Sequence, residues 1–330
     1  MKEKLISIVI PSFNSFKTLK QSIKACLSQD YPSEAIEIIV VDDGSTDKTG
    51  EFLDKTGIKY IYQDNAGPAA ARNTGWKSAK GEIVFFTDSD CLPSLAWVKN
   101  LVKYYEDAQV ACAGGSYDIA NPQNLLASLI HEEIMLRHAK MPLRVKALGS
   151  YNFSARKIIL EETGGFNQQY PMASGEDNDL SYKIIKKGYA LIFDKNVKVC
   201  HYHPENPIKY LRTQFWHGFW RVKLYLEHPQ MSMGDDYSGL LDYAQPVLAL
   251  ALIITFPFLF FHDLRNIWFA LFAAQIFLHL QVGVIMAIRC RNLKYLLFII
   301  LSLFRSFARG LGLASALLSR IVVDYRINKR

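Results

Sequence analysis

Acidic residues stand directly behind two apolar runs of this sequence. Asp42 and Asp43 close "IEIIVVDD", and Asp88 and Asp90 follow "EIVFFT". Neighbouring carboxylates repel one another, and burial penalises each charge unless a cation or hydrogen-bond donors compensate it. Mg²⁺ and Mn²⁺ prefer such oxygen ligands, often together with substrate phosphates. A lone Asp-x-Asp pair is more often a turn after a strand, but acidic residues behind two runs favour a cation and phosphate site.

A second acidic group, "GEDND", and two histidines lie further along the chain. Glu176 and Asp177 fall in the expected first turn of a helix, where carboxylates also serve simply as caps that complement the helix dipole. The functional alternative is that Asp177 is a general base, which requires it to lie within hydrogen-bond reach of the hydroxyl it deprotonates. His201 and His203 share one face if "KVCHYH" is extended, and either could complete a metal shell with Asp90.

Strands and helices must alternate to position these residues. Apolar runs predict strands at residues 5–10, 36–41, 58–63 and 82–88. Helical spacing or helix-forming composition follows the first three runs. This alternation predicts an α/β fold with a mostly parallel sheet, covered on both faces, whose ligand site lies at the carboxyl ends of the strands. The four aspartates and the loop after the first strand are therefore expected to converge on one cleft.

Five motifs in sequence order resemble the family 2 inverting glycosyltransferases of GT-A fold, which is Rossmann-like. They are "ISIVIPSFNS", "IIVVDDGSTDKT", "DNAGPAAARNTG", "FFTDSD" and "GGFNQQYPMASGEDNDLSYKIIKKGY". The resemblance covers residues 5–204 and implies a metal-dependent enzyme of the hexosyltransferase type. Such an enzyme moves a sugar from a nucleotide-diphosphate sugar, here a UDP- or GDP-sugar, to a hydroxyl acceptor with inversion. The alternatives are a catalytically inactive nucleotide-binding membrane scaffold and a sugar nucleotidyltransferase.

The resemblance also implies a role for each site residue. Nucleotide-sugar binding falls to the loop after the first strand, to the acidic motifs and to the arginine of "AARNTG": Pro11, Ser12, Asn14, Asp42, Asp43, Arg72, Asp88 and Glu176. In such enzymes Arg72 would reach the base or the diphosphate. Asp90 and His201, with His203 as the alternative, would hold Mn²⁺ or Mg²⁺. Asp177 would be the catalytic base.

The carboxyl-terminal part of the chain is far more apolar than the rest. Residues 243–262 and 266–288 are long enough to cross a bilayer as a helical hairpin. Residues 295–322 contain Arg305 and Arg309, and because burying both charges is costly, an interfacial amphipathic helix is favoured over a third membrane helix. We therefore expect three parts: a GT-A domain at 1–204, juxtamembrane interfacial helices at 205–240 and a membrane region at 241–330.

Cysteine use and charge argue against other classes of protein. Five cysteines stand singly, without a C-x-x-C pair: Cys26, Cys91, Cys112, Cys200 and Cys290. This spacing argues against a disulfide framework and a zinc knuckle. The net charge is +7, and the basic residues gather near the apolar tail, which indicates anionic lipid headgroups and not nucleic acid.

The apolar tail and its flanking charges predict where the protein resides. Its first residues lack the pattern of a signal peptide, and basic residues flank the two expected spans. We therefore expect an integral membrane protein with its catalytic domain and both termini in the cytoplasm. A membrane location in turn favours a lipid-linked or membrane-proximal glycan as the acceptor.

Overall fold

The computed structural model describes residues 4–232 and 234–319, and these residues form two compact units. The first unit contains Met1–Pro122 and Arg137–His203, and the second contains Gln123–Leu136 and Pro204–Arg330. The last residues of the expected segment 295–322 and the carboxyl terminus lie outside the described residues.

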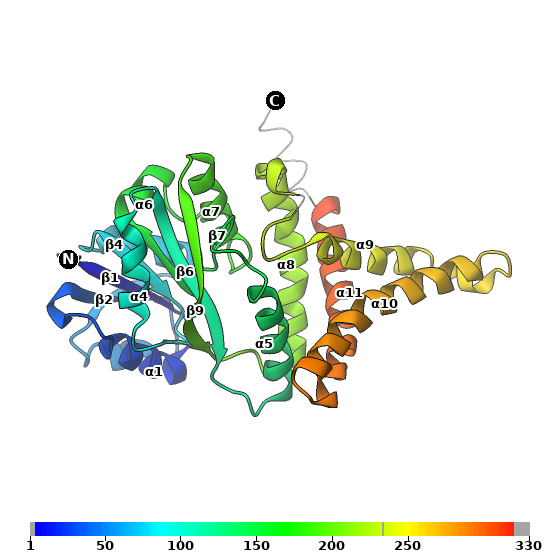
Figure 1. Ribbon diagram of the computed structural model, residues 1–330, viewed down its shortest axis with the longest axis horizontal. Helices are drawn as coiled ribbons and strands as arrows, with labels where there is room; N and C mark the ends of the chain where they lie inside the picture. Colours follow the sequence, from blue (N-terminus) through cyan, green and yellow to red (C-terminus); the bar gives the residue numbers. More distant parts are fainter. Residues whose placement is uncertain (1–3, 233, 320–330) are drawn as a thin grey trace. The chain divides into compact units, whose positions relative to one another are not determined.

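One sheet forms the centre of the first unit (Figure 1). Its strands, in chain order, are β1 Ile6–Ser12, β2 Ile36–Asp43, β3 Lys59–Gln63, β4 Ile83–Thr87, β5 Cys91–Pro93, β6 Val110–Ile119, β7 Arg144–Val145, β8 Asn152–Arg156 and β9 Ala190–His201. Their spatial order is β3-β2-β1-β4-β8-β6-β9-β5, and β7 pairs with β9. The first four strands match the predicted apolar runs.

The sheet is mixed, where the sequence suggested a mostly parallel one. The strands β1 to β4 run parallel, as does β6 with β9. The strand β8 lies antiparallel between β4 and β6, and β5 and β7 lie antiparallel to β9. All the strands that break the parallel pattern follow residue 88, beyond the predicted runs. Antiparallel neighbours need no helical crossover, so the strand and helix alternation that predicts a parallel sheet does not reveal them.

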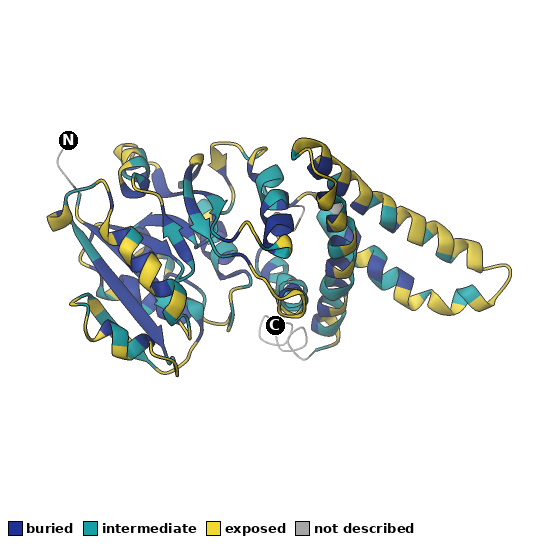
Figure 2. Ribbon diagram, turned by 90° about the horizontal axis from the view of Figure 1, so that it is seen from below, coloured by how far each residue is buried: buried dark blue, intermediate teal, exposed yellow. Residues whose placement is uncertain are grey.

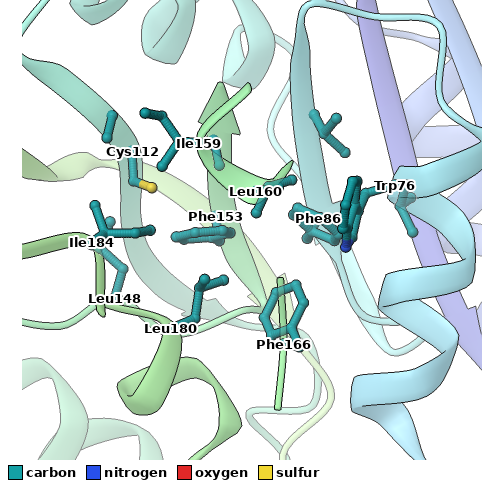
Figure 3. Packing of buried hydrophobic residues seen from close by; sticks show 14 of the residues in the cluster. Trp76, Phe86, Cys112, Leu148, Phe153, Ile159, Leu160, Phe166, Leu180 and Ile184 are labelled. Atoms are coloured by element: carbon teal, nitrogen blue, oxygen red, sulfur yellow. The ribbon is translucent and has the colours of Figure 1, made fainter. Parts of the chain in front are cut away.

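Helices cover both faces of this sheet. They are α1 Phe16–Leu27, α2 Thr49–Leu53, α3 Pro68–Ser78, α4 Trp97–Val102, α6 Lys157–Thr163 and α7 Glu176–Lys186. Side chains alternate across each strand, so Phe85 packs on one face against Trp97, with ring centroids 4.9 Å apart. On the other face Phe86 packs against Phe166, with centroids 5.2 Å apart, in the cluster shown in Figure 3. This two-sided burial explains the continuous apolar run of β4.

The second unit is helical. It contains most of α5 Leu125–His138, together with α8 Pro207–Glu227, α9 Leu240–Ile254, α10 Arg265–Arg289 and α11 Leu297–Leu318. Two segments are long and apolar enough to cross a membrane, namely α10 and residues 293–318. Many large apolar side chains of this unit are exposed, and α10 in particular is largely exposed (Figure 2).

The expected first span, residues 243–262, is not one continuous helix. The helix α9 ends at Ile254 and a 3₁₀ helix follows at Phe256–Phe260. Fifteen residues of α-helix extend about 22 Å, less than the ~30 Å of a bilayer core. Pro257 lacks an amide hydrogen and restricts the residue before it, which accounts for the end of the helix.

Both arginines of the last apolar segment have buried partners within the second unit. Arg305 forms an ion pair with Glu133 of α5, and Arg309 donates a hydrogen bond from Nε to Oε1 of Gln214 in α8 at 2.8 Å. At Gly312 an added Cβ would lie 2.0 Å from the carbonyl oxygen of Phe215, so α8 and α11 pack with their backbones close together. The interfacial helix expected at 295–322 is therefore part of a packed helical unit, in which the buried charge of Arg305 has a charged partner and the half-buried Arg309 has a polar one.

Candidate active site

The loop after β1 is tied to the loop after β2. Asn14 has a positive φ of 49°, which Asn tolerates better than most residues. Its side-chain oxygen accepts hydrogen bonds from the backbone N–H groups of Thr46 and Asp47, and its own N–H donates to Oγ of Ser45 at 2.9 Å. In the parallel pairing of β1 and β2, Ser12 stands opposite Asp42, and Pro11 precedes it in the same register. The first group of expected site residues therefore shares one edge of the sheet.

The two aspartates that end β2 are buried and compensated by donors of the chain itself. Asp42 accepts a hydrogen bond from the backbone of Ser45 at 2.9 Å. Asp43 accepts from the side chain of Gln63 at 2.6 Å and from the backbone N–H groups of Ala66 and Gly67, both at 2.9 Å. Donors of the chain itself therefore offset the burial of both carboxylates, where the electrostatic argument from the sequence invoked a cation.

Arg72 lies buried in α3 between two of the expected site carboxylates. Its Nη2 donates to Oδ1 of Asp88 at 2.8 Å, and its Nη1 donates to Oε1 of Glu176 at 2.9 Å. The resemblance led us to expect an arginine that reaches the nucleotide, whereas both terminal nitrogens meet protein carboxylates here. Burial first and the charge of Asp177 second raise the pKa of Glu176 to about 7, against the opposing effect of Arg72.

A possible metal-binding group forms where β4 and β9 end. Ligand atoms of Asp90, Cys91 and His201 lie within 4.8 Å of one another. The antiparallel pairing of β5 with β9 places Cys91 opposite His201, and His201 Nε2 lies 3.5 Å from Asp90 Oδ2. Burial would raise the pKa of Asp90, but the hydrogen bond and charge of His201 outweigh it and hold the pKa below its usual range. Burial raises the pKa of the Cys91 thiol well above its usual value. Mn²⁺ and Mg²⁺ prefer oxygen ligands to soft thiolates and Mn²⁺ also accepts imidazole, so Asp90 and His201 are the donors of this group that suit them best.

The two histidines differ in their surroundings. His201 faces Asp90, whereas His203 is buried behind it, with its Nδ1 3.1 Å from Nδ1 of His201. Asn121 holds the backbone of His203 through hydrogen bonds of 3.0 Å and 2.9 Å. His203 is therefore placed to orient His201, as outer-shell partners orient metal-binding histidines elsewhere.

Asp177 lies in the first turn of α7, partly exposed. Its Oδ1 accepts a hydrogen bond from the backbone of Asn178 at 2.8 Å, and its Oδ2 accepts one from the backbone of Ser150 at 3.4 Å. Gly175, the residue before the helix begins, has a φ of 127°, a conformation that strongly favours glycine. The Asp177 carboxylate therefore lies at the start of α7 and stays partly exposed.

Two tyrosines that the sequence reading missed lie between the group of Asp90 and His201 and the segment that contacts Asp177. The rings of Tyr117 and Tyr151 stack with centroids 3.6 Å apart. Tyr117 also lies 4.9 Å from the ring of His201, and Tyr151 directly follows Ser150, which contacts Asp177. The tripeptide Gly-Ser-Tyr occurs at both positions, 115–117 and 149–151, and this repeat is the signal that could have indicated them.

Solved structures with the same fold define the class of protein. A mannosyltransferase from Pyrobaculum calidifontis, solved with GDP-Man and Mn²⁺, superposes with a TM-score of 0.61 at 20% identity, covering 96% of this chain and 88% of that one. GalNAc-T7, solved with UDP, GalNAc and Mn²⁺, gives a TM-score of 0.50 at 20% identity, covering 71% of this chain and 52% of that one. The curled mixed sheet is therefore a GT-A fold, as the sequence predicted.

Sequence relatives place the chain in a family. Residues 7–161 match Glycosyl transferase family 2. The glycosyltransferase AglE of Haloferax volcanii is 28% identical over 229 residues, which cover 67% of this chain and 74% of that protein. The Escherichia coli enzyme UDP-Glc:alpha-D-GlcNAc-diphosphoundecaprenol beta-1,3-glucosyltransferase WfaP is 30% identical over 188 residues, which cover 56% of this chain and 71% of that one. This chain belongs to glycosyltransferase family 2, and the predicted use of a nucleotide-sugar donor fits that family.

Proposed function

We propose that this protein is a membrane-anchored, metal-dependent inverting glycosyltransferase. It moves a sugar from a UDP- or GDP-sugar to a hydroxyl of a lipid-linked or membrane-proximal glycan. The observation that carries this proposal is the arrangement of the first unit, where the stacked pair of Tyr117 and Tyr151 lies between a group with metal-ligand chemistry and a partly exposed aspartate, Asp177. In an inverting displacement the leaving group and the general base lie on opposite sides of the sugar. Such a reaction therefore requires that the metal-binding group and the base be separated from one another.

The donor side of the site would be formed by the strand ends. The loop containing Ser12 and Asn14, with Asp43, would hold the nucleoside, and Asp88 would meet the ribose. Asp90 and His201 would hold Mn²⁺ or Mg²⁺, which stabilises negative charge on the departing diphosphate when it is bound. The solved mannosyltransferase of the same fold carries GDP-Man and Mn²⁺, which supports this assignment.

The acceptor side would be served by Asp177. Its carboxylate would take the proton of the attacking hydroxyl as that oxygen bonds to the anomeric carbon and the bond from that carbon to the diphosphate breaks. The nucleoside diphosphate leaves with the bonding electrons, and no covalent sugar–enzyme intermediate forms. A positioned general base of this kind contributes roughly 10²–10⁴-fold to rate.

The apolar second unit supports a membrane-bound acceptor. Phe260 is 77% exposed and Ile288 is 71% exposed, values that suit contact with lipid. The relative WfaP is named for an acceptor linked to diphosphoundecaprenol. Basic residues flank the apolar segments, which supports a cytoplasmic catalytic unit and cytoplasmic termini. The boundaries at residues 204 and 240 stay a prediction.

The experiment that tests this function is a donor screen. Full-length protein in detergent is incubated with UDP-, GDP- and dTDP-sugars, Mn²⁺ or Mg²⁺ and a membrane lipid extract, and nucleoside diphosphate release is measured. We expect release with one donor, dependent on the metal and on the extract, and an inverted anomeric configuration in the product by NMR. Metal-dependent donor binding without release under any condition would favour the inactive scaffold. A sugar nucleotidyltransferase does not fit a family 2 chain.

A further inference from the structure

The guanidinium of Arg72 joins two motifs that are far apart in the sequence. Its partner Asp88 lies 16 residues away and its partner Glu176 lies 104 residues away, and both contacts are shorter than 3.0 Å. The side chains of Arg72 and Glu176 are each 2% exposed. A planar guanidinium can hold two carboxylates at once, which a lysine ammonium does with far less geometric control.

Each partner of Arg72 lies within two residues of a residue that takes part in the proposed reaction, Asp90 or Asp177. Asp88 lies two residues before Asp90 in the loop that ends β4. Glu176 directly precedes Asp177, and its second oxygen, Oε2, accepts hydrogen bonds from the backbone N–H groups of Ser174 at 2.8 Å and Gly175 at 3.1 Å. One oxygen of Glu176 therefore holds Arg72 while the other fixes the turn that starts α7.

The guanidinium of Arg72 is buried, so little of it is accessible to a nucleotide. Its central carbon lies 5.5 Å from the centroid of Phe166, and the side chain is buried. Its Nε has no hydrogen-bond partner among the described residues, and this atom too is buried. Burial would lower the pKa of Arg72, but the charges of Asp88 and Glu176 outweigh that effect and raise it, so the group stays charged.

We propose that Arg72 is a positioning residue that locks the metal-side loop to the base-bearing turn, and that it does not bind the donor. This inference rests on the proposed function for its kinetic consequence. When the bridge is removed, Asp90 and Asp177 lose their fixed separation. Small displacements of groups that must act on one substrate reduce turnover more than they reduce binding.

The first test is structural and needs no substrate. Hydrogen–deuterium exchange of the full-length protein in detergent is compared for wild type, Arg72→Gln and Glu176→Gln, with Lys77→Gln as the control, since it removes an exposed charge from the same helix. We expect faster exchange in both 86–92 and 172–180 for Arg72→Gln, and the same pattern for Glu176→Gln. Unchanged exchange in either segment would overturn the proposal.

The second test separates turnover from binding. For Arg72→Gln we expect kcat to fall at least tenfold while the donor Kd changes less than threefold, and Lys77→Gln to match wild type. For Arg72→Lys we expect an intermediate kcat. A tenfold weaker donor Kd at unchanged kcat would instead show a donor-binding arginine. If wild type released no nucleoside diphosphate, the transferase function would fail, while the exchange experiment would still decide whether Arg72 forms the bridge.

Discussion

Nη1 of Arg305 lies 3.3 Å from Oε2 of Glu133, and both side chains are only 6% exposed. The pair joins α5 to α11 within the second unit. Removing one partner of a buried ion pair leaves an uncompensated charge and costs about 3–5 kcal/mol. We therefore predict that Glu133→Ala strongly lowers the thermal midpoint of the detergent-purified protein.

A matched glutamate provides the control for this prediction. Glu51 pairs with Lys55 on the surface of the first unit, with both side chains more than half exposed. Glu51→Ala is expected to leave the thermal midpoint unchanged, because exposed pairs contribute little. Equal midpoints for Glu133→Ala and wild type would contradict a structural role for the buried pair.

The second prediction concerns the close packing of α8 and α11. Gly312→Ala would place a Cβ 2.0 Å from the carbonyl oxygen of Phe215, which only a backbone shift can relieve. Alanine favours a helix by about 1 kcal/mol over glycine, but overpacking costs about 1–3 kcal/mol. We expect a lower thermal midpoint than for Gly239→Ala, where no atom of the described residues lies within 4 Å of the added Cβ. A stabilised Gly312→Ala protein would show that the two helices do not pack this closely.

The third prediction concerns metal affinity. Because His203 contacts Nδ1 of His201, His203→Ala is expected to weaken Mn²⁺ binding about 10–100-fold, as loss of an outer-shell partner does. His201→Ala is expected to weaken it more, and Cys91→Ala to leave it nearly unchanged. Electron paramagnetic resonance of free Mn²⁺ measures these affinities without any substrate. A loss in Cys91→Ala as large as in His201→Ala would identify the thiolate as a ligand.

The fourth prediction concerns pH. The pKa of Glu176 is about 7 in the folded protein, whereas the value for an unperturbed glutamate is 4.5. Between these two pH values the folded state therefore binds more protons than the unfolded state does. Its contribution to stability is fully present below pH 4.5 and is lost as the pH rises to 7, with a slope of at most about 1.4 kcal/mol per pH unit. Relative to Glu176→Gln, wild type should therefore lose thermal stability from pH 5 to pH 8. Parallel midpoints of the two proteins across this range would contradict the raised pKa.

Local sequence patterns predicted the first strands of the sheet. The runs at 5–10 and 36–41 correspond to β1 and β2, because buried strands need continuous apolar residues. The strands β5 and β7 are three and two residues long, too short for any periodicity to develop. Their pairing with β9, which brings Cys91 opposite His201, is set by tertiary contacts alone.

Residue types predicted which side chains gather in one group better than they predicted individual contacts. The sequence indicated that Asp90 and His201 belong together, and the structure places them in one group. It could not reveal that Arg72 meets Asp88 and Glu176, because nothing local to α3 specifies partners so far along the chain. The same holds for Glu133 and Arg305, which lie 172 residues apart. The charge of an arginine can be read from a sequence, but its partner depends on the fold.

The most direct test of the central claim compares Asp90→Asn and Asp177→Asn in one donor assay. Binding of the nucleotide sugar and release of the nucleoside diphosphate are measured on the same full-length preparations, with and without Mn²⁺. We predict that Asp177→Asn binds the donor as wild type does but releases product about 10²–10⁴ times more slowly, and that Asp90→Asn loses the metal-dependent part of binding. Wild-type turnover in Asp177→Asn would contradict the assignment of the base and, with it, the proposed mechanism.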